Sequence, residues 1–216
     1  MTDYSIAREN MIESQVRPNG ITDHRIIAAL AGLAREDFVP ESRRPVAYVD
    51  EDVELIPGRY LVEAMAFARL VQLAEIKPGD RVLHIGAGSG YGSAVLSQLA
   101  GSVTALECDS GLAAQARANL ADRGNVAVVE GPLQEGWKAA APYDVILIEG
   151  RAGEVPQAVQ AQLANGGRLA AVVGDRPVAK AQLLTVHGDA TAVRSAFDAS
   201  VAMLPGLEAK RPAFVF

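Results

Sequence analysis

The sequence is poor in cysteine, histidine and aromatic residues. It holds one cysteine, three histidines and 5% aromatic residues in 216. The lone cysteine, Cys108, cannot close an intramolecular disulfide, which is typical of a reducing compartment such as the cytoplasm. No apolar run approaches the length of a membrane span, and residues 1–4 carry neither the basic nor the apolar region of a secretory signal. We therefore expect a cytoplasmic protein without a membrane partner.

Positive charge is also scarce. There are 20 lysines and arginines against 26 acidic residues, for a formal net charge of −6. This balance disfavours a nucleic-acid partner, because phosphates attract basic surfaces. Half of the residues are hydrophobic, which suffices for one buried core but not for two domains of ordinary size. We therefore predict a single domain, residues 1–216.

The sequence does contain a glycine-rich turn after its first buried apolar run. Residues 81–86 are typical of a strand, a helical pattern begins at Tyr91, and glycines stand at every second position between them. Such a turn brings the backbone close to a nucleotide-like ligand, although tight strand–helix turns also use glycine for steric reasons alone. The spacing is G-x-G-x-G, because the dinucleotide fingerprint needs Gly or Ala where this chain has Tyr91 or Ser93.

An acidic residue, Glu107, ends the next apolar run at 102–107. A carboxylate at the tip of the second strand can accept hydrogen bonds from two ribose hydroxyls, the alternative being a solvated strand end. Cys108 follows, and we expect it to pack near the ligand.

Strand and helix patterns alternate from residue 81 onward. We predict strands at 81–86, 102–107, 126–130, 143–148 and 167–173, and helices at 91–100, 110–122 and 154–164. This alternation predicts an α/β fold with a Rossmann-like, doubly wound, mainly parallel sheet and helices on both faces. The runs at 180–186, 191–199 and 212–216 predict antiparallel strands at the sheet edge.

The N-terminal part is mainly helical in pattern. Apolar spacing predicts helices near 6–16, 26–33 and 60–76, with an extended connection between 40 and 58. We therefore divide the domain into a helical N-terminal portion, 1–76, and an α/β core, 77–216.

Sequence motifs along nearly the whole chain resemble the protein-L-isoaspartate O-methyltransferase family. The N-terminal ones are Met11-Ile12 with Gln15-Val16-Arg17, Gly20-Ile21-Thr22-Asp23, Arg35-Glu36-Asp37-Phe38-Val39-Pro40 and Ala47-Tyr48. The later ones are 77–83 running into 85–91, Glu135-Gly136-Trp137, Tyr143-Asp144, and Gln162-Leu163 leading into 166–169. The glycine turn with Glu107 is shared more widely by S-adenosylmethionine-dependent methyltransferases.

This resemblance implies a function and a set of site residues, with portion 1–76 on the acceptor side and 77–216 as the cofactor-binding core. The function is methyl transfer from S-adenosylmethionine to isoaspartyl carboxylates of a protein or peptide acceptor. The implied cofactor residues are His84, Gly86, Ala87, Gly88, Gly90, Glu107, Cys108, Pro132 and Leu133. Two of these depart from the family pattern. His84 replaces an acid and could instead be a hydrogen-bonded imidazole within the sheet, and Pro132 replaces part of a Gly-Asp-Gly turn near the adenine.

The acceptor side also departs from the family pattern. A gapless comparison places Tyr60 at the family's threonine and Val62 at its serine. Valine cannot donate a hydrogen bond to a carboxylate, so an isoaspartyl peptide is expected to be a poor substrate. Arg59, with Tyr60 second, is the candidate replacement donor, although a solvent-exposed Arg59 is the simpler reading.

Two other functions stay open. One is a methyltransferase for a different acceptor with a rebuilt site, and the other is a non-catalytic homologue that binds the cofactor or a partner. Residues 148–151 lack the Asn-Pro-Pro-Tyr-type segment that positions an exocyclic amine, which weakens a nucleic-acid N-methyltransferase reading.

Overall fold

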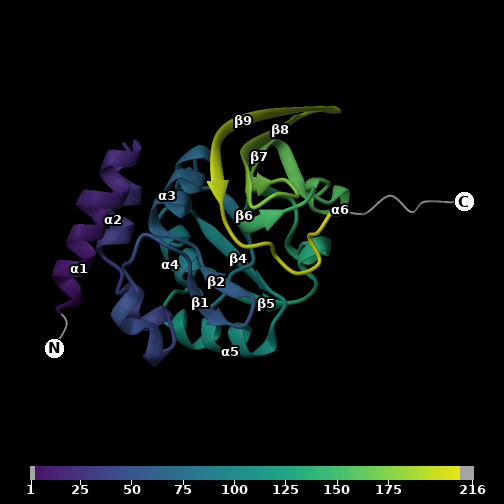
Figure 1. Cartoon of the computed structure of the whole chain (residues 1–216). Helices are drawn as coiled ribbons and strands as arrows, with labels where there is room; N and C mark the ends of the chain where they lie inside the picture. The colour runs from purple at the N-terminus through teal and green to yellow at the C-terminus, as the bar shows by residue number, and fades with distance from the viewer. Residues whose placement is uncertain (1–2, 210–216) are drawn as a thin grey trace, which may run out of the picture.

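A seven-stranded sheet lies at the centre of the computed structural model, which describes residues 3–209 (Figure 1). The strand order is β5-β4-β3-β6-β7-β8-β9. The strands are β3 (Arg81–Ile85), β4 (Ser102–Glu107), β5 (Val126–Glu130), β6 (Tyr143–Ala152), β7 (Leu163–Val173), β8 (Val178–His187) and β9 (Ala190–Ser200). Strands β3 to β7 pair in parallel, and β8 and β9 pair antiparallel. The predicted Rossmann-like sheet is therefore confirmed, with the chain order reversing between β3 and β6.

Alternate side chains of the central strands bury against two separate cores. On β3, Val82 joins one core while Leu83 and Ile85 join the other. Helices α3 (Ala64–Leu73), α4 (Tyr91–Leu96) and α5 (Ser110–Asn119) pack on the first face. The short helix α6 (Gln157–Gln160) and residues 204–207 cover the second. The helix predicted over 154–164 was too long, because Leu163 already belongs to β7.

The N-terminal portion is helical as predicted, with tighter and wider turns between its α-helices. Helix α1 (Tyr4–Met11) continues as a π-helical turn, Ile12–Val16, and α2 (His24–Ala31) follows. Asp3 and Asp23 cap the two helices by accepting hydrogen bonds from backbone N–H groups of the first turn. Short 3₁₀ helices, Arg17–Asn19, Arg35–Phe38 and Glu41–Val46, complete this part of the chain.

A two-stranded hairpin, β1 (Val53–Ile56) and β2 (Arg59–Leu61), stands where the extended connection and the start of a helix were predicted. The prediction of a helix from residue 60 was wrong at that end, because α3 begins at Ala64. Gly58 has a φ of +78° and makes the turn that pairs β2 with β1. Arg59 and Leu61 therefore point inward, while Tyr60 points outward.

The two antiparallel strands predicted at 180–186 and 191–199 are confirmed as β8 and β9. The strand predicted at 212–216 lies outside the described residues. Within 3–209, no helix combines the length and the hydrophobicity needed to cross a bilayer.

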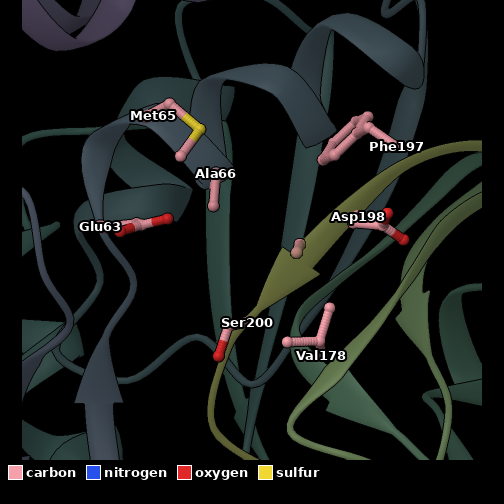
Figure 2. A pocket seen from close by; sticks show the side chains of 8 residues that line it. Glu63, Met65, Ala66, Val178, Phe197, Asp198 and Ser200 are labelled. Atoms are coloured by element: carbon pink, nitrogen blue, oxygen red, sulfur yellow. The ribbon is translucent and has the colours of Figure 1, made fainter.

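The start of α3 faces the ends of β8 and β9 across a cavity of about 270 Å³ (Figure 2). Glu63 lines it from the α3 side. Burial, and after it the neighbouring carboxylates of Asp52, Asp50 and Glu51, raises the pKa of Glu63 from 4.5 to about 7. Glu63 is therefore a carboxyl group that the folded chain holds partly protonated near neutral pH.

The Glu63 carboxyl is expected to make the protein less stable as the pH rises from about 4.5 to 7. In that range the folded state binds a proton that the unfolded state has released, so raising the pH favours unfolding. Glu63→Gln removes this loss and should be more stable than the wild type by ~1–2 kcal/mol at pH 8 but not at pH 4.5, after allowance for solvent screening. Thermal unfolding from pH 4.5 to 8 measures it, with Glu154→Gln at an exposed acid as control. A constant difference across that range would contradict the expectation.

Candidate functional site

The glycine turn and Glu107 meet at the carboxyl ends of β3 and β4, as predicted. The Gly88 N–H donates to Glu107 Oε2 over 2.8 Å. Gly86, Gly88 and Gly90 all have positive φ values, 83°, 56° and 100°, which other residues rarely adopt. The turn lies next to the point where the strand order reverses, the usual ligand position in such sheets.

Several backbone donors of this turn are already used within the protein. The N–H groups of Gly86 and Ala87 both donate to Leu106 O, over 3.0 and 3.1 Å, and Gly90 N–H donates to Ala87 O over 2.9 Å. These hydrogen bonds stabilise the turn itself.

Glu107 is fully buried and its carboxylate accepts five hydrogen bonds. Oε1 accepts from the N–H groups of Cys108 (2.8 Å) and Asp109 (2.9 Å) and from Arg59 Nη1. Oε2 accepts from Gly88 and from Arg59 Nη2 over 2.6 Å. A carboxylate offers about four lone-pair positions, so every one of them is in use. The alternative of a solvated strand end is therefore wrong.

Arg59 of the hairpin holds Glu107 as a bidentate ion pair across 48 residues of sequence. Only 6% of Arg59 is exposed, so the simpler reading of a solvated arginine is wrong. Its Nη1 also lies 3.5 Å from the Cys108 sulfur. From the same hairpin Leu55 covers the turn, since a Cβ atom built on Gly88 would lie 3.1 Å from Leu55 Cδ1.

The ion pair sets the protonation of both partners. Burial alone would raise the pKa of Glu107, but the hydrogen bonds and the charge of Arg59 outweigh it and hold that pKa below its usual value. Burial likewise opposes the charge of Arg59, and Glu107 reverses this effect and raises the pKa of the guanidinium. Both groups are therefore charged at neutral pH, as a strong bidentate pair requires.

His84 lies within the sheet as part of a buried polar chain with two residues that sequence reasoning missed. Its Nδ1 is 2.7 Å from Ser93 Oγ, and its Nε2 is 2.8 Å from Glu149 Oε2. This is the hydrogen-bonded imidazole that the sequence left open. Gly92 makes room for it, because a Cβ atom there would lie 1.9 Å from Glu149 Oε2. Gly92, the fourth glycine of the turn, was the feature of the sequence that could have indicated this buried polar chain.

Of the remaining candidate cofactor residues, Pro132 and Leu133 follow β5 and Cys108 follows β4. Pro132 is exposed and precedes a 3₁₀ turn, Leu133–Glu135. Leu133 itself is fully buried in the second core. Cys108 is half-buried beside Arg59. Their contact with a cofactor stays a prediction.

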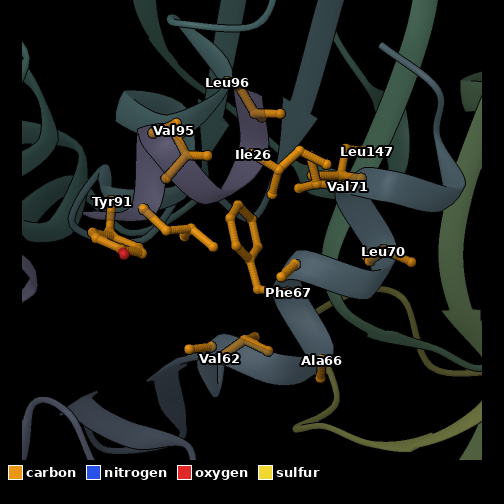
Figure 3. Packing of buried hydrophobic residues seen from close by; sticks show 14 of the residues in the cluster. Ile26, Val62, Ala66, Phe67, Leu70, Val71, Tyr91, Val95, Leu96 and Leu147 are labelled. Atoms are coloured by element: carbon orange, nitrogen blue, oxygen red, sulfur yellow. The ribbon is translucent and has the colours of Figure 1, made fainter. Parts of the chain in front are cut away.

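On the acceptor side, β2 presents its two candidate donors in opposite directions. Arg59 points inward to Glu107, while Tyr60 is 36% exposed on the other face of the strand. Val62 packs into the first core near Phe67 (Figure 3). The carbonyl of Val62 accepts a hydrogen bond from Arg35 Nη2 over 2.7 Å. The valine therefore has a packing role here, whatever its role toward an acceptor.

A family model, Protein-L-isoaspartate(D-aspartate) O-methyltransferase, matches residues 7–206. The chain belongs to the protein-L-isoaspartate O-methyltransferase family. It is 39% identical over 175 residues to Protein-L-isoaspartate O-methyltransferase 1 of Rhodopseudomonas palustris strain HaA2, covering 80% of this chain and 71% of that relative. Its identity to the Koribacter versatilis relative of the same family is 38% over 176 residues, covering 81% and 79% of the two chains.

Solved structures of the family share the fold. One protein-L-isoaspartate O-methyltransferase superposes with a TM-score of 0.80 at 25% identity, covering 93% of this chain and 67% of that one. A Plasmodium falciparum structure described as a complex with S-adenosyl-L-homocysteine gives a TM-score of 0.75 at 18% identity, covering 94% and 99%. The predicted family and fold class are thus confirmed.

Proposed function

We propose that this family member transfers the methyl group of S-adenosylmethionine to a carboxylate of a protein or peptide acceptor. The observation that carries the proposal is the pairing of the glycine turn with the Glu107 carboxylate, joined by the Gly88 N–H. An acid in this position, at the end of β4, can accept hydrogen bonds from the two ribose hydroxyls of an adenosyl group.

The residues fit such a cofactor in their chemistry. Glu107 would hold the ribose, and the glycines, lacking side chains, allow close approach of the backbone. The bound cofactor would supply an activated methyl group on a sulfonium. An acceptor carboxylate is already ionised at neutral pH, so the chain needs no general base. Its task is to align the acceptor and to exclude water.

The isoaspartyl carboxylate is the leading acceptor, because the relatives at 38–39% identity carry that activity in their names. Of the two candidate donors of β2, the exposed Tyr60 stays the candidate on the acceptor side, whereas Arg59 is bound to Glu107 on the cofactor side. A protein or peptide acceptor is also consistent with an exposed Tyr60 beside the hairpin turn. We further propose a cytoplasmic location, in keeping with a chain that has a single cysteine.

A non-catalytic, partner-binding homologue is the second candidate. The observation that favours it is the saturation of the Glu107 carboxylate by Arg59 and three backbone N–H groups. Under this reading the ion pair is permanent and the cofactor never binds.

Transfer of radiolabelled methyl groups to a synthetic isoaspartyl peptide tests the proposal, with the matching aspartyl peptide as control. We expect slow, base-labile labelling of the isoaspartyl peptide alone. The label should be lost in Glu107→Gln, whose neutral amide is a weaker acceptor than a carboxylate. The absence of labelling, together with no binding of S-adenosylhomocysteine to any variant, would favour the non-catalytic reading.

A further inference from the structure

The Arg59 guanidinium occupies the position that a ribose would need on Glu107. Both of its terminal nitrogens engage the carboxylate, one on each oxygen. The three backbone donors to the same carboxylate come from Gly88, Cys108 and Asp109 and are fixed by the turn and by the start of α5. Arg59 is therefore the only side chain among these five donors, and so the one most easily displaced.

A ribose and Arg59 exclude one another at this carboxylate. Two vicinal hydroxyls donate to the same pair of oxygens that the arginine fork engages, and these oxygens have no lone pair to spare. If Arg59 leaves, the three backbone N–H groups still stabilise the Glu107 charge. The carboxylate can therefore accept hydrogen bonds either from the Arg59 guanidinium or from two ribose hydroxyls, but not from both at once.

The position of Arg59 in the hairpin gives it a way out. It directly follows the Gly58 turn, and its neighbour Tyr60 is exposed. Only three residues of β2 hold it to β1, with an irregular register between Glu54 and Ile56. A long arginine side chain at such an edge can carry its charge into water by rotation about its own bonds.

We propose that Arg59 is an internal competitor of the cofactor, which seals the ribose position of Glu107 and must be released before an adenosyl group can bind there. The inference rests on the proposed function. It assigns to Arg59 the control of cofactor affinity, through a contact made inside the cofactor site rather than at the acceptor.

Calorimetric titration with S-adenosylhomocysteine tests the inference. We expect Arg59→Met and Arg59→Gln to bind it at least tenfold more tightly than the wild type, because neither places a charged fork on Glu107. Arg43→Met is the matched control. It removes the same charge from an exposed arginine that pairs with Glu54 of the same hairpin over 3.1 Å, and it should bind within twofold of the wild type.

The possible results separate the inference from the function beneath it. Equal or weaker binding by the Arg59 variants, with the wild type binding well, would overturn the competitor role and leave the methyltransferase proposal standing. No binding by any protein, wild type or variant, would overturn both.

If the variants do not fold, association kinetics of the wild type decide: we expect the observed rate to level off at high S-adenosylhomocysteine because Arg59 must leave first. A rate that keeps rising linearly would contradict the inference.

Discussion

Replacing Glu107 by alanine is expected to lower the free energy of unfolding by about 3–5 kcal/mol. The substitution leaves Arg59, which is 6% exposed, as a buried charge without a partner, and it strands the N–H groups of Gly88, Cys108 and Asp109. Denaturant unfolding monitored by circular dichroism measures the loss. Glu130→Ala is the matched control, because Glu130 sits directly beside Glu107 on the next strand but is exposed. Its loss should stay below about 0.5 kcal/mol.

A double-mutant cycle separates the ion pair from the rest of this loss. Glu107→Ala combined with Arg59→Met removes both charges and should recover roughly 1–3 kcal/mol relative to the sum of the single variants. The lowered pKa of Glu107 means that the wild-type contribution is present at neutral pH and is lost only as acid protonates the folded carboxylate. Simple additivity of the two variants would mean that the pair does not form in solution.

Replacing Arg35 by alanine should destabilise the fold by a similar amount, about 3–5 kcal/mol. Arg35 is 1% exposed, and its Nε and Nη2 donate to the carbonyls of Ala47 and Val62, each over 2.7 Å. The variant would orphan both carbonyls and leave a cavity beside Tyr91, whose ring centre lies 4.9 Å from the guanidinium carbon. Denaturant unfolding again measures the effect.

The two carbonyls that Arg35 binds stand before and after the β1–β2 hairpin, so the loss should also loosen the hairpin. Limited proteolysis is expected to cut near Gly58 faster in Arg35→Ala than in the wild type. Arg35→Lys should not restore stability, because an ammonium cannot span two carbonyls as a planar fork does. The control is Arg17→Ala, at a 47% exposed arginine in a surface pair with Glu13. A loss in Arg35→Ala no greater than that of Arg17→Ala would contradict this account.

The parallel part of the sheet could be predicted from sequence because each of its strands contains a separate apolar run. The strands at 102–107 and 126–130 match the structure residue for residue, and the glycine turn marks the end of β3. The helix predicted over 60–76 failed at its start because β2 is three residues long. An apolar Leu61 suits a helix and a strand equally well, and only pairing with β1 decides between them. The division of the chain at residues 76 and 77 stays a prediction.

The cofactor side of the site was predictable for a similar reason, since Gly88 follows β3 and Glu107 ends β4, and the ends of these neighbouring parallel strands must meet. The partner of Glu107 was not predictable. Arg59 reaches it from a hairpin 48 residues away, and nothing local to Arg59 distinguishes a buried arginine from a solvated one. In a strand, alternate side chains point to opposite faces, so Arg59 and Leu61 would share a face that Tyr60 does not. This pattern could have indicated that Arg59 is buried, but only if β2 had been recognised as a strand.

Cys108 makes the opening of this site a measurable chemical rate. It is the only thiol of the chain, and Arg59 Nη1 lies 3.5 Å from its sulfur. Burial, followed by the Glu107 charge, raises the pKa of the thiol and slows its reaction while the pair is closed. The rate at which a disulfide reagent labels wild-type Cys108 therefore follows how often Arg59 stands away from Glu107.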